Sequence, residues 1–175
     1  MVVTIRAAER ADSDGITDVQ IAAWRAGYSH VFPESVLYAE DFDRSRRRYW
    51  ASWRFSPGHR LAVAVRDVDG SVVGFSSYGP ERERARGFTG RAELYAFYVH
   101  PDDWGTGTAT ALMEHTEHRL RAEGFETAVL WVLEDNPRGR AFYTKHGWAA
   151  TGLSARYDEY DGVDVLEVEY RKEWR

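Results

Sequence analysis

Cysteine is absent from the 175-residue chain, which excludes disulfide bonds, thiolate metal sites and a cysteine nucleophile. Lysine is scarce, because only Lys145 and Lys172 are present and neither follows a glycine-rich loop. A P-loop needs its lysine on the nucleotide phosphates, so this class of phosphate site is excluded too. We expect no metal site in this chain.

Long apolar runs are also missing. No run of eighteen apolar residues occurs, and residues 1–12 lack the long apolar core of a signal peptide. The formal net charge is −5 and the pI is about 5.7, which argues against a nucleic-acid binder. These absences predict a soluble, cytoplasmic protein with neither nucleic-acid nor membrane partners. At 43% apolar residues, a chain of this length is expected to form one domain.

The spacing of apolar residues predicts alternating strands and helices. Residues 92–99, "AELYAFYV", are apolar on both faces, as expected of a central strand that is covered on two sides. A helix predicted over 105–123 joins this strand to one at 127–133, which makes the two strands a parallel pair with a right-handed crossover. Further strands are expected at 2–8, 61–67, 71–78, 148–157 and 163–171, and further helices at 12–28, 41–55 and 137–146. The order predicts a three-layer α/β fold with a mixed central sheet and helices on both faces.

Residues 99–112, "VHPDDWGTGTATAL", place two glycines where the helix 105–123 should begin. A helix N-terminus offers unpaired N–H groups and partial positive charge, and small residues let a phosphate reach those donors. The turn therefore suits an anion, and we expect a pyrophosphate. Two alternatives remain from the residues alone. One is a bend with no ligand, and the other is a dinucleotide fold, although Thr110 stands where that fold has its third glycine.

Two motifs resemble those of the GNAT superfamily of N-acetyltransferases. The stretch "AELYAFYVHPDDWGTGTATALMEH" is similar to its central motif, in which a strand precedes Arg/Gln-x-x-Gly-x-Gly/Ala at the start of a helix. Residues 133–148, "LEDNPRGRAFYTKHGW", are similar to the next motif, an Asn before a helix that carries Phe-Tyr and then Gly-aromatic. Trp104 departs from the usual Arg or Gln. The resemblance implies a single N-acetyltransferase domain over 1–175 with acetyl-CoA as cosubstrate.

The resemblance also assigns roles to individual residues. The pantetheine arm would lie along the end of the strand 92–99 and Asn136 would contact it, while the turn would cradle the pyrophosphate. Tyr143 matches the general acid that protonates the leaving thiolate. The positions implied in cofactor binding are Phe97, Tyr98, Val99, Trp104, Gly105, Thr106, Gly107, Thr108, Ala109, Thr110, Asn136 and Tyr143.

The implied chemistry is direct acyl transfer from a thioester to an amine in a ternary complex, which agrees with the lack of cysteine. The acceptor ammonium must first lose a proton, and Glu93 is the candidate base. A solvated glutamate at a strand end and a water relay are the alternatives. The backbone N–H near Val99 is the candidate donor to the oxyanion. For Tyr143, the alternative is a buried tyrosine that packs beside Phe142.

The acceptor is poorly specified by the sequence. Residues 24–55 hold nine aromatics, some of which must belong to the core, and the last hairpin carries several acids that could receive a cationic amine. We expect an amine-bearing acceptor, either a small molecule or a protein, and a homodimer as a candidate assembly. The alternative function is a non-catalytic CoA-binding or protein-interaction module on the same fold. The acids in question are Asp158, Glu159, Asp161 and Asp164.

Overall fold

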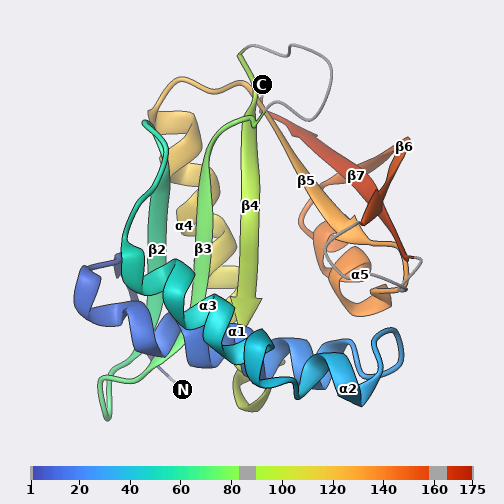
Figure 1. Ribbon diagram of the computed structural model, residues 1–175. Helices are drawn as coiled ribbons and strands as arrows, with labels where there is room; N and C mark the ends of the chain where they lie inside the picture. Colours follow the sequence, from blue (N-terminus) through green and yellow to red (C-terminus); the bar gives the residue numbers. More distant parts are fainter. Residues whose placement is uncertain (1, 83–89, 158–164, 175) are drawn as a thin grey trace. The chain divides into compact units, whose positions relative to one another are not determined.

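A computed structural model of the chain describes residues 2–82, 90–157 and 165–174 (Figure 1). It divides into two compact units. The first contains Met1–Tyr78 and Ala96–Arg119, and the second contains Gly79–Tyr95 and Leu120–Arg175. Strand β4 (Ala92–Val99) passes from the second unit into the first, so each unit holds part of it.

In the first unit the strand order is β1-β2-β3-β4. Strand β1 (Val3–Ala7) pairs antiparallel with β2 (Arg60–Arg66), and β2 pairs antiparallel with β3 (Val72–Pro80). The turn between β2 and β3 contains Gly70 with a φ of +74°. This conformation favours glycine and confirms the hairpin expected at Asp69-Gly70.

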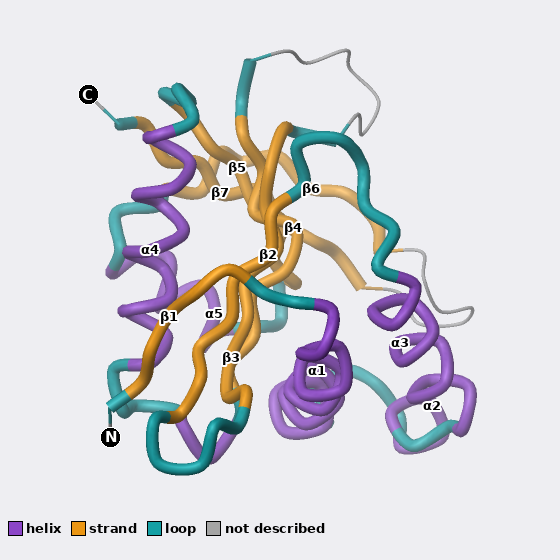
Figure 2. The backbone as a smooth tube through the Cα atoms, turned by 90° about the vertical axis from the view of Figure 1, so that its left-hand side faces the viewer, coloured by secondary structure: helices purple, strands orange, loops and turns teal. Residues whose placement is uncertain are grey.

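Helices cover both faces of the sheet in the first unit (Figures 1 and 2). Helices α1 (Ser13–Gly27) and α3 (Glu40–Ser52) lie on one face, and α4 (Thr108–Ala122) lies on the other. None of the helices in the described ranges is long and apolar enough to cross a bilayer. The remaining short helices of this unit are η1 (Arg10–Asp12), α2 (Glu34–Leu37) and η2 (Pro101–Asp103).

The core of the first unit is built from residues that repeat at the period of their own element. Residues at i and i+2 of a strand point to the same side, and residues at i and i+3 of a helix share a face. Leu61 and Val63 of β2 accordingly pack in one buried cluster with Ile16 and Val19 of α1. The aromatic members of that cluster are Trp50 of α3 and Phe75 of β3.

In the second unit the strand order is β4-β5-β7-β6. Strand β5 (Thr127–Leu133) pairs parallel with β4 at only three positions, from Ala92 to Leu94. It pairs antiparallel along its whole length with β7 (Val165–Glu173). The remaining elements of this unit are α5 (Pro137–Lys145) and β6 (Ala149–Tyr157), which pairs antiparallel with β7.

The expected mixed α/β fold and the parallel pair of 92–99 with 127–133 are confirmed. The helix expected from residue 105 begins instead at Thr108, because Gly105 and Gly107 have positive φ and so cannot belong to a right-handed helix. Sequence spacing also missed α2, which has only four residues. The segment that joins the last two strands lies outside the described residues.

Candidate functional site

The turn between β4 and α4 is the feature on which the candidate site rests. Strand β4 ends at Val99, and the short helix η2 carries the chain to Asp103. Gly105 then has a φ of +79° and Gly107 a φ of +96°, and α4 begins at the next residue. No described atom lies within 4 Å of a Cβ built on either glycine. The glycines are therefore required by backbone conformation, and the space in front of them is open.

Hydrogen bonds within the turn fix its shape. The Thr106 hydroxyl donates to the Asp103 carbonyl oxygen at 2.8 Å, and the Thr106 and Thr108 hydroxyls are 3.0 Å apart. Ala111 makes its helical bond to the Gly107 carbonyl oxygen, which sets the start of α4. The N-terminal end of α4 therefore follows directly on an exposed glycine turn, an arrangement that favours negative charge.

The end of β4 is held to this turn by Trp104. Its indole N–H donates to the Val99 carbonyl oxygen at 2.9 Å. Tyr98 is fixed through its side chain, because its hydroxyl accepts from the Trp24 indole N–H at 3.0 Å. Phe97 is half-buried on the same strand end. The structure thus brings together ten of the positions implied in cofactor binding, namely Phe97, Tyr98, Val99, Trp104, Gly105, Thr106, Gly107, Thr108, Ala109 and Thr110.

Glu93, Asn136 and Tyr143 lie in the second unit. Glu93 is 1% exposed on β4, so it is not a solvated glutamate. Its Oε1 accepts from the Arg82 guanidinium at 2.6 Å, and its Oε2 accepts from the Arg82 backbone N–H at 2.9 Å. Arg82 also lies over the ring of Tyr95, at 4.5 Å from the centroid. The carboxylate of Glu93 is therefore held in a charge-assisted ion pair.

A second ion pair adjoins that of Glu93 in the same unit. Arg91 donates to both carboxylate oxygens of Glu81, at 2.5 and 2.9 Å, and lies 3.7 Å from the buried carboxylate of Glu169. The hydrogen bond to Glu81 raises the pKa of Arg91, and the charges of Glu81, Glu169 and Glu93 add to this effect. The sequence analysis missed these partners. The alternating Glu and Arg around 81–82 and 91–93 were the available signal.

Asn136 and Tyr143 are both placed by helix α5. Asn136 is its N-cap, and the side-chain oxygen accepts from the Gly139 backbone N–H at 2.9 Å. Its amide nitrogen supplies donors besides this cap. The ring of Tyr143 is buried and lies 5.6 Å from Phe142 and 6.3 Å from Tyr170, measured between centroids. Tyr143 thus has the aromatic packing that the alternative interpretation required.

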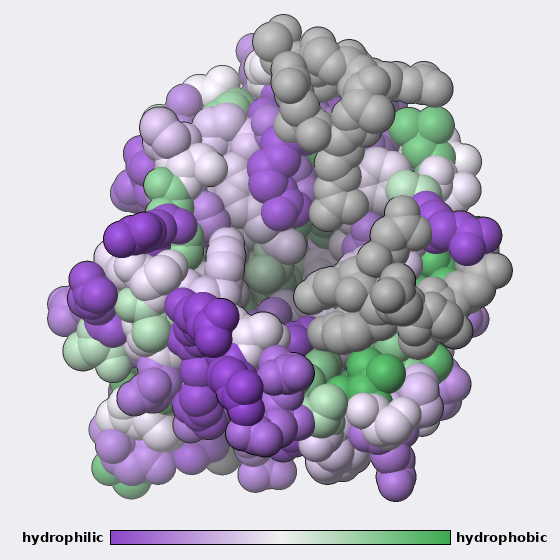
Figure 3. Space-filling model, in the orientation of Figure 1, coloured by the Kyte–Doolittle hydropathy of each residue, from purple (hydrophilic) through white to green (hydrophobic). Residues whose placement is uncertain are grey.

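The aromatic side chains of residues 24–55, which the sequence analysis considered in connection with the acceptor, are only partly buried. Trp24, Phe42 and Trp50 are buried, whereas Tyr38 and Tyr49 are more than half exposed. Other aromatics of this region are buried as well, at Tyr28 and Phe32. Figure 3 shows hydrophilic side chains over α3, on the face of the molecule that it presents. The acids proposed for the last hairpin, Asp158, Glu159, Asp161 and Asp164, lie outside the described residues.

Within the described ranges, no group of three or more His, Asp or Glu side chains is arranged to hold a metal ion.

Comparisons with known proteins identify similar sequences and folds. The family model described as "Acetyltransferase (GNAT) family" matches residues 21–148. An uncharacterized N-acetyltransferase of Bacillus subtilis, YuaI, is 32% identical over 136 residues, which are 78% of this chain and 75% of that protein. A mycothiol acetyltransferase of Streptomyces griseus is 30% identical over 160 residues. This match covers 89% of the chain but only 46% of that protein, so the chain spans about half of its length.

One similar solved structure is that of the PaiA N-acetyltransferase from Thermoplasma acidophilum in complex with coenzyme A. Its TM-score is 0.72 at 18% sequence identity, and the match covers 99% of this chain and 100% of that chain. At this identity the likeness concerns the fold.

Replacing Trp104 by Phe should loosen the turn from the end of β4. The substitution keeps an aromatic ring and removes the N–H that donates to Val99, a bond of a type that contributes about 0.5–1.5 kcal/mol to stability. We expect a fall of that size in the free energy of unfolding, measured by urea denaturation. Trp53→Phe is the control, because its indole N–H makes no hydrogen bond within the described part of the chain. Equal losses in the two variants would show that only ring size matters.

Proposed function

The chain belongs to the acetyltransferase (GNAT) family, and from this premise we propose that it is an N-acetyltransferase that moves an acetyl group from acetyl-CoA to a primary amine. The observation that carries the proposal is the glycine turn between β4 and α4, with its two positive-φ residues and open space in front. The solved PaiA structure, which contains coenzyme A, supports the choice of cosubstrate. We further propose that the whole chain acts as one catalytic domain.

The turn is proposed to hold the pyrophosphate of acetyl-CoA through backbone N–H groups of residues 104–110. Backbone donors at a helix N-terminus bind phosphate without a basic side chain, so Trp104 in place of Arg or Gln is compatible with binding. The pantetheine arm would add to the edge of β4 at residues 97–99 by main-chain hydrogen bonds, with Asn136 as a side-chain partner. The parallel ladder of β4 with β5 ends at Leu94, and this short pairing supports strand addition farther along β4.

The proposed reaction is direct. The amine nitrogen attacks the thioester carbonyl carbon, the C–N bond forms, and the C–S bond then breaks. Glu93 would take the proton that the amine loses, and Tyr143 would give a proton to the departing thiolate. The Val99 backbone N–H is the proposed donor to the oxyanion. Since Arg82 and an acceptor ammonium carry the same charge, the acceptor could replace Arg82 at Glu93 before the transfer.

A thermal titration tests the cosubstrate. A ligand that binds only the folded state at a hundredfold excess over its Kd stabilises a protein by about 2.7 kcal/mol. For a chain of this size we expect acetyl-CoA to raise the Tm by about 5–11 °C, and NAD to leave it unchanged. A shift with NAD and none with acetyl-CoA would overturn the proposal.

A matched pair of glycine variants tests the turn itself. Gly107→Val and Gly124→Val place the same side chain at similar φ values, +96° and +90°, and neither new Cβ has a described atom within 4 Å. The backbone strain should therefore be similar, whereas only residue 107 faces the proposed phosphates. We expect Gly107→Val to lose CoA binding by isothermal titration, and Gly124→Val to keep it, with unchanged circular dichroism in both. If Gly107→Val keeps its affinity for CoA, the turn does not bind the cosubstrate and is a bend with no ligand.

Glu93→Gln and Tyr143→Phe test the proposed acid and base. Each should lower kcat by about 10²–10⁴-fold, the usual size of a general acid–base step, and Glu93→Gln should leave the KM for acetyl-CoA nearly unchanged. The Glu93→Gln loss should shrink as pH rises toward the acceptor's pKa of about 10.4, because more amine then arrives deprotonated. Release of free CoA thiol over a panel of amines gives the rate, and the chain adds no thiol of its own.

The controls for this pair are Glu81→Gln, which removes a carboxylate from the neighbouring ion pair, and Tyr170→Phe, which removes the hydroxyl of a ring whose centroid lies 6.3 Å from that of Tyr143. Both should retain kcat. A Glu93→Gln variant with the wild-type pH profile would favour a water relay. If the fall in kcat of Tyr143→Phe does not depend on the leaving thiol, Tyr143 is not the acid and has a packing role only. A wild-type protein that binds CoA but acetylates no amine would favour the non-catalytic alternative.

A further inference from the structure

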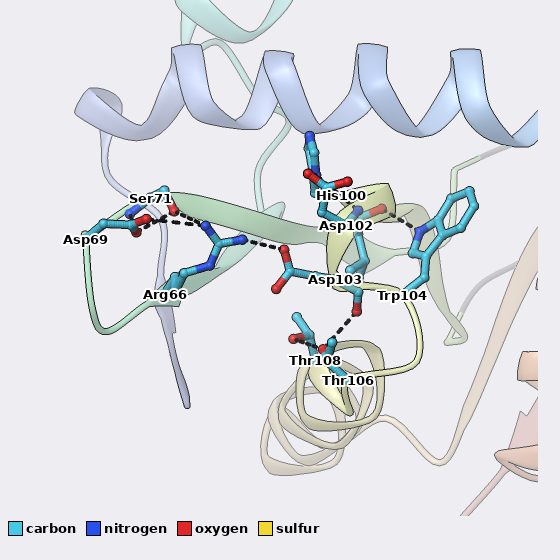
Figure 4. Close-up of polar contacts among 10 residues, drawn as sticks. Arg66, Asp69, Ser71, His100, Asp102, Asp103, Trp104, Thr106 and Thr108 are labelled. Atoms are coloured by element: carbon cyan, nitrogen blue, oxygen red, sulfur yellow. Dashed lines mark hydrogen bonds and ion pairs between the residues drawn. The ribbon is translucent and has the colours of Figure 1, made fainter. Parts of the chain in front are cut away.

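A buried carboxylate lies at the entrance to the glycine turn. Asp103 ends the helix η2, two residues before Gly105, and is only 1% exposed. Its Oδ2 accepts from the Arg66 guanidinium at 2.7 Å (Figure 4). Its Oδ1 has no hydrogen-bond partner within the described part of the chain. A buried charge is costly unless it is paired, so Arg66 is the group that makes this carboxylate tolerable.

The backbone of Asp103 ties the turn together at the same point. Its N–H donates to the His100 carbonyl oxygen at 2.9 Å, on the side of β4. Its carbonyl oxygen accepts from the Thr106 hydroxyl, on the side of α4. Asp103 is thus hydrogen-bonded to residues on both sides of it, His100 and Thr106. The contact of its carboxylate with Arg66 restrains Asp103 and, through it, the turn.

Arg66 is itself held by the hairpin between β2 and β3. It is the last residue of β2, and its guanidinium donates at 3.3 Å to both the Asp69 carboxylate and the Ser71 hydroxyl. Asp69 in turn accepts from the Ser71 N–H and hydroxyl. Hydrogen bonding to Asp103 is the largest cause of the raised pKa of Arg66. The glycine turn is thus anchored to a hairpin that lies 37 residues earlier in the sequence.

We propose that Arg66 and Asp103 are positioning residues, which set the affinity of the glycine turn for the pyrophosphate of acetyl-CoA without touching it. Arg66 has two tasks in this account. It fixes the turn in the shape that presents its N–H groups, and it neutralises a carboxylate that would otherwise repel an anion at the start of α4. The inference rests on the proposed function, because it assigns the control of that same site.

The test compares two ligands that share the pantetheine arm, of which only one carries the pyrophosphate and the nucleotide. CoA carries the pyrophosphate, whereas pantetheine has the same thiol-bearing arm without pyrophosphate or nucleotide. The variants are Arg66→Met, Asp103→Asn and the double variant, and Kd is measured for both ligands by NMR titration. We expect Arg66→Met, which leaves the Asp103 charge unpaired, to weaken CoA binding by about tenfold or more. Asp103→Asn loses the same anchoring contact but also removes the negative charge, so its loss should be smaller. Both variants should change the pantetheine Kd by less than about twofold. The double variant should lose less than the product of the single losses, because the two residues act as a unit.

Arg44→Met is the matched control, since it breaks an exposed arginine pair with Asp41 on α3 and should change neither Kd. Arg66→Lys keeps the charge but not the planar fork, so it should fold and show a smaller loss for CoA. It keeps the proposal testable if Arg66→Met does not fold. A merely structural role would weaken both ligands alike.

The outcomes separate the two proposals. If the wild-type protein binds CoA and the variants bind it equally well, the positioning role is wrong and the proposed function stands. Equal losses for CoA and pantetheine also overturn the positioning role. If the wild-type protein does not bind CoA, the proposed function fails and this inference fails with it.

Discussion

The backbone conformation at Gly105 and Gly107 is the constraint on which the proposed cofactor site depends. Both residues have positive φ, a region that side-chain-bearing residues rarely adopt. They lie in the segment that separates the end of β4 at Val99 from the start of α4 at Thr108. This conformation places an exposed turn directly before the N-terminus of α4. Without it the helix would start earlier, as the sequence spacing predicted, and its first turn would replace the open space.

Contacts from both sides keep this turn in place. Trp104 connects it to the carbonyl group at the end of β4, and Asp103 connects it through Arg66 to the hairpin of β2 and β3. Each contact joins the turn to a strand of the sheet. When the backbone donors are already in place, the entropy lost on binding a phosphate is smaller. The proposed anion site is therefore best understood as a property of the sheet as well as of the helix.

In the second unit, charge governs the proposed chemistry. Three carboxylates, of Glu81, Glu93 and Glu169, share two guanidinium groups, of Arg82 and Arg91. Glu93 and Glu169 are buried, so the charge of each depends on its arginine partner. In the proposed mechanism, Glu93 becomes available as a base when an acceptor ammonium takes the place of Arg82. Acceptor binding and proton removal would then be linked steps.

Local patterns in the sequence predicted the strands and the parallel pair well, since the apolar runs at 92–99 and 127–133 are bounded by polar or helix-breaking residues. They could not predict the start of α4, because periodicity does not report φ. Side-chain contacts between segments far apart in the sequence could not be predicted from these patterns either. Arg66 and Asp103 are 37 residues apart, and Arg82 and Glu93 are 11 apart, so no spacing rule links them. The candidate site is proposed mainly from its resemblance to a known motif.

Backbone amide NMR during a titration with CoA tests the central claim most directly. The account predicts that, as CoA saturates the protein, the largest shifts of N–H signals fall on residues 104–110, with Gly105 and Gly107 among them. Saturation by CoA with these signals unmoved, and with the shifts gathered elsewhere, would contradict the claim that the glycine turn binds the pyrophosphate.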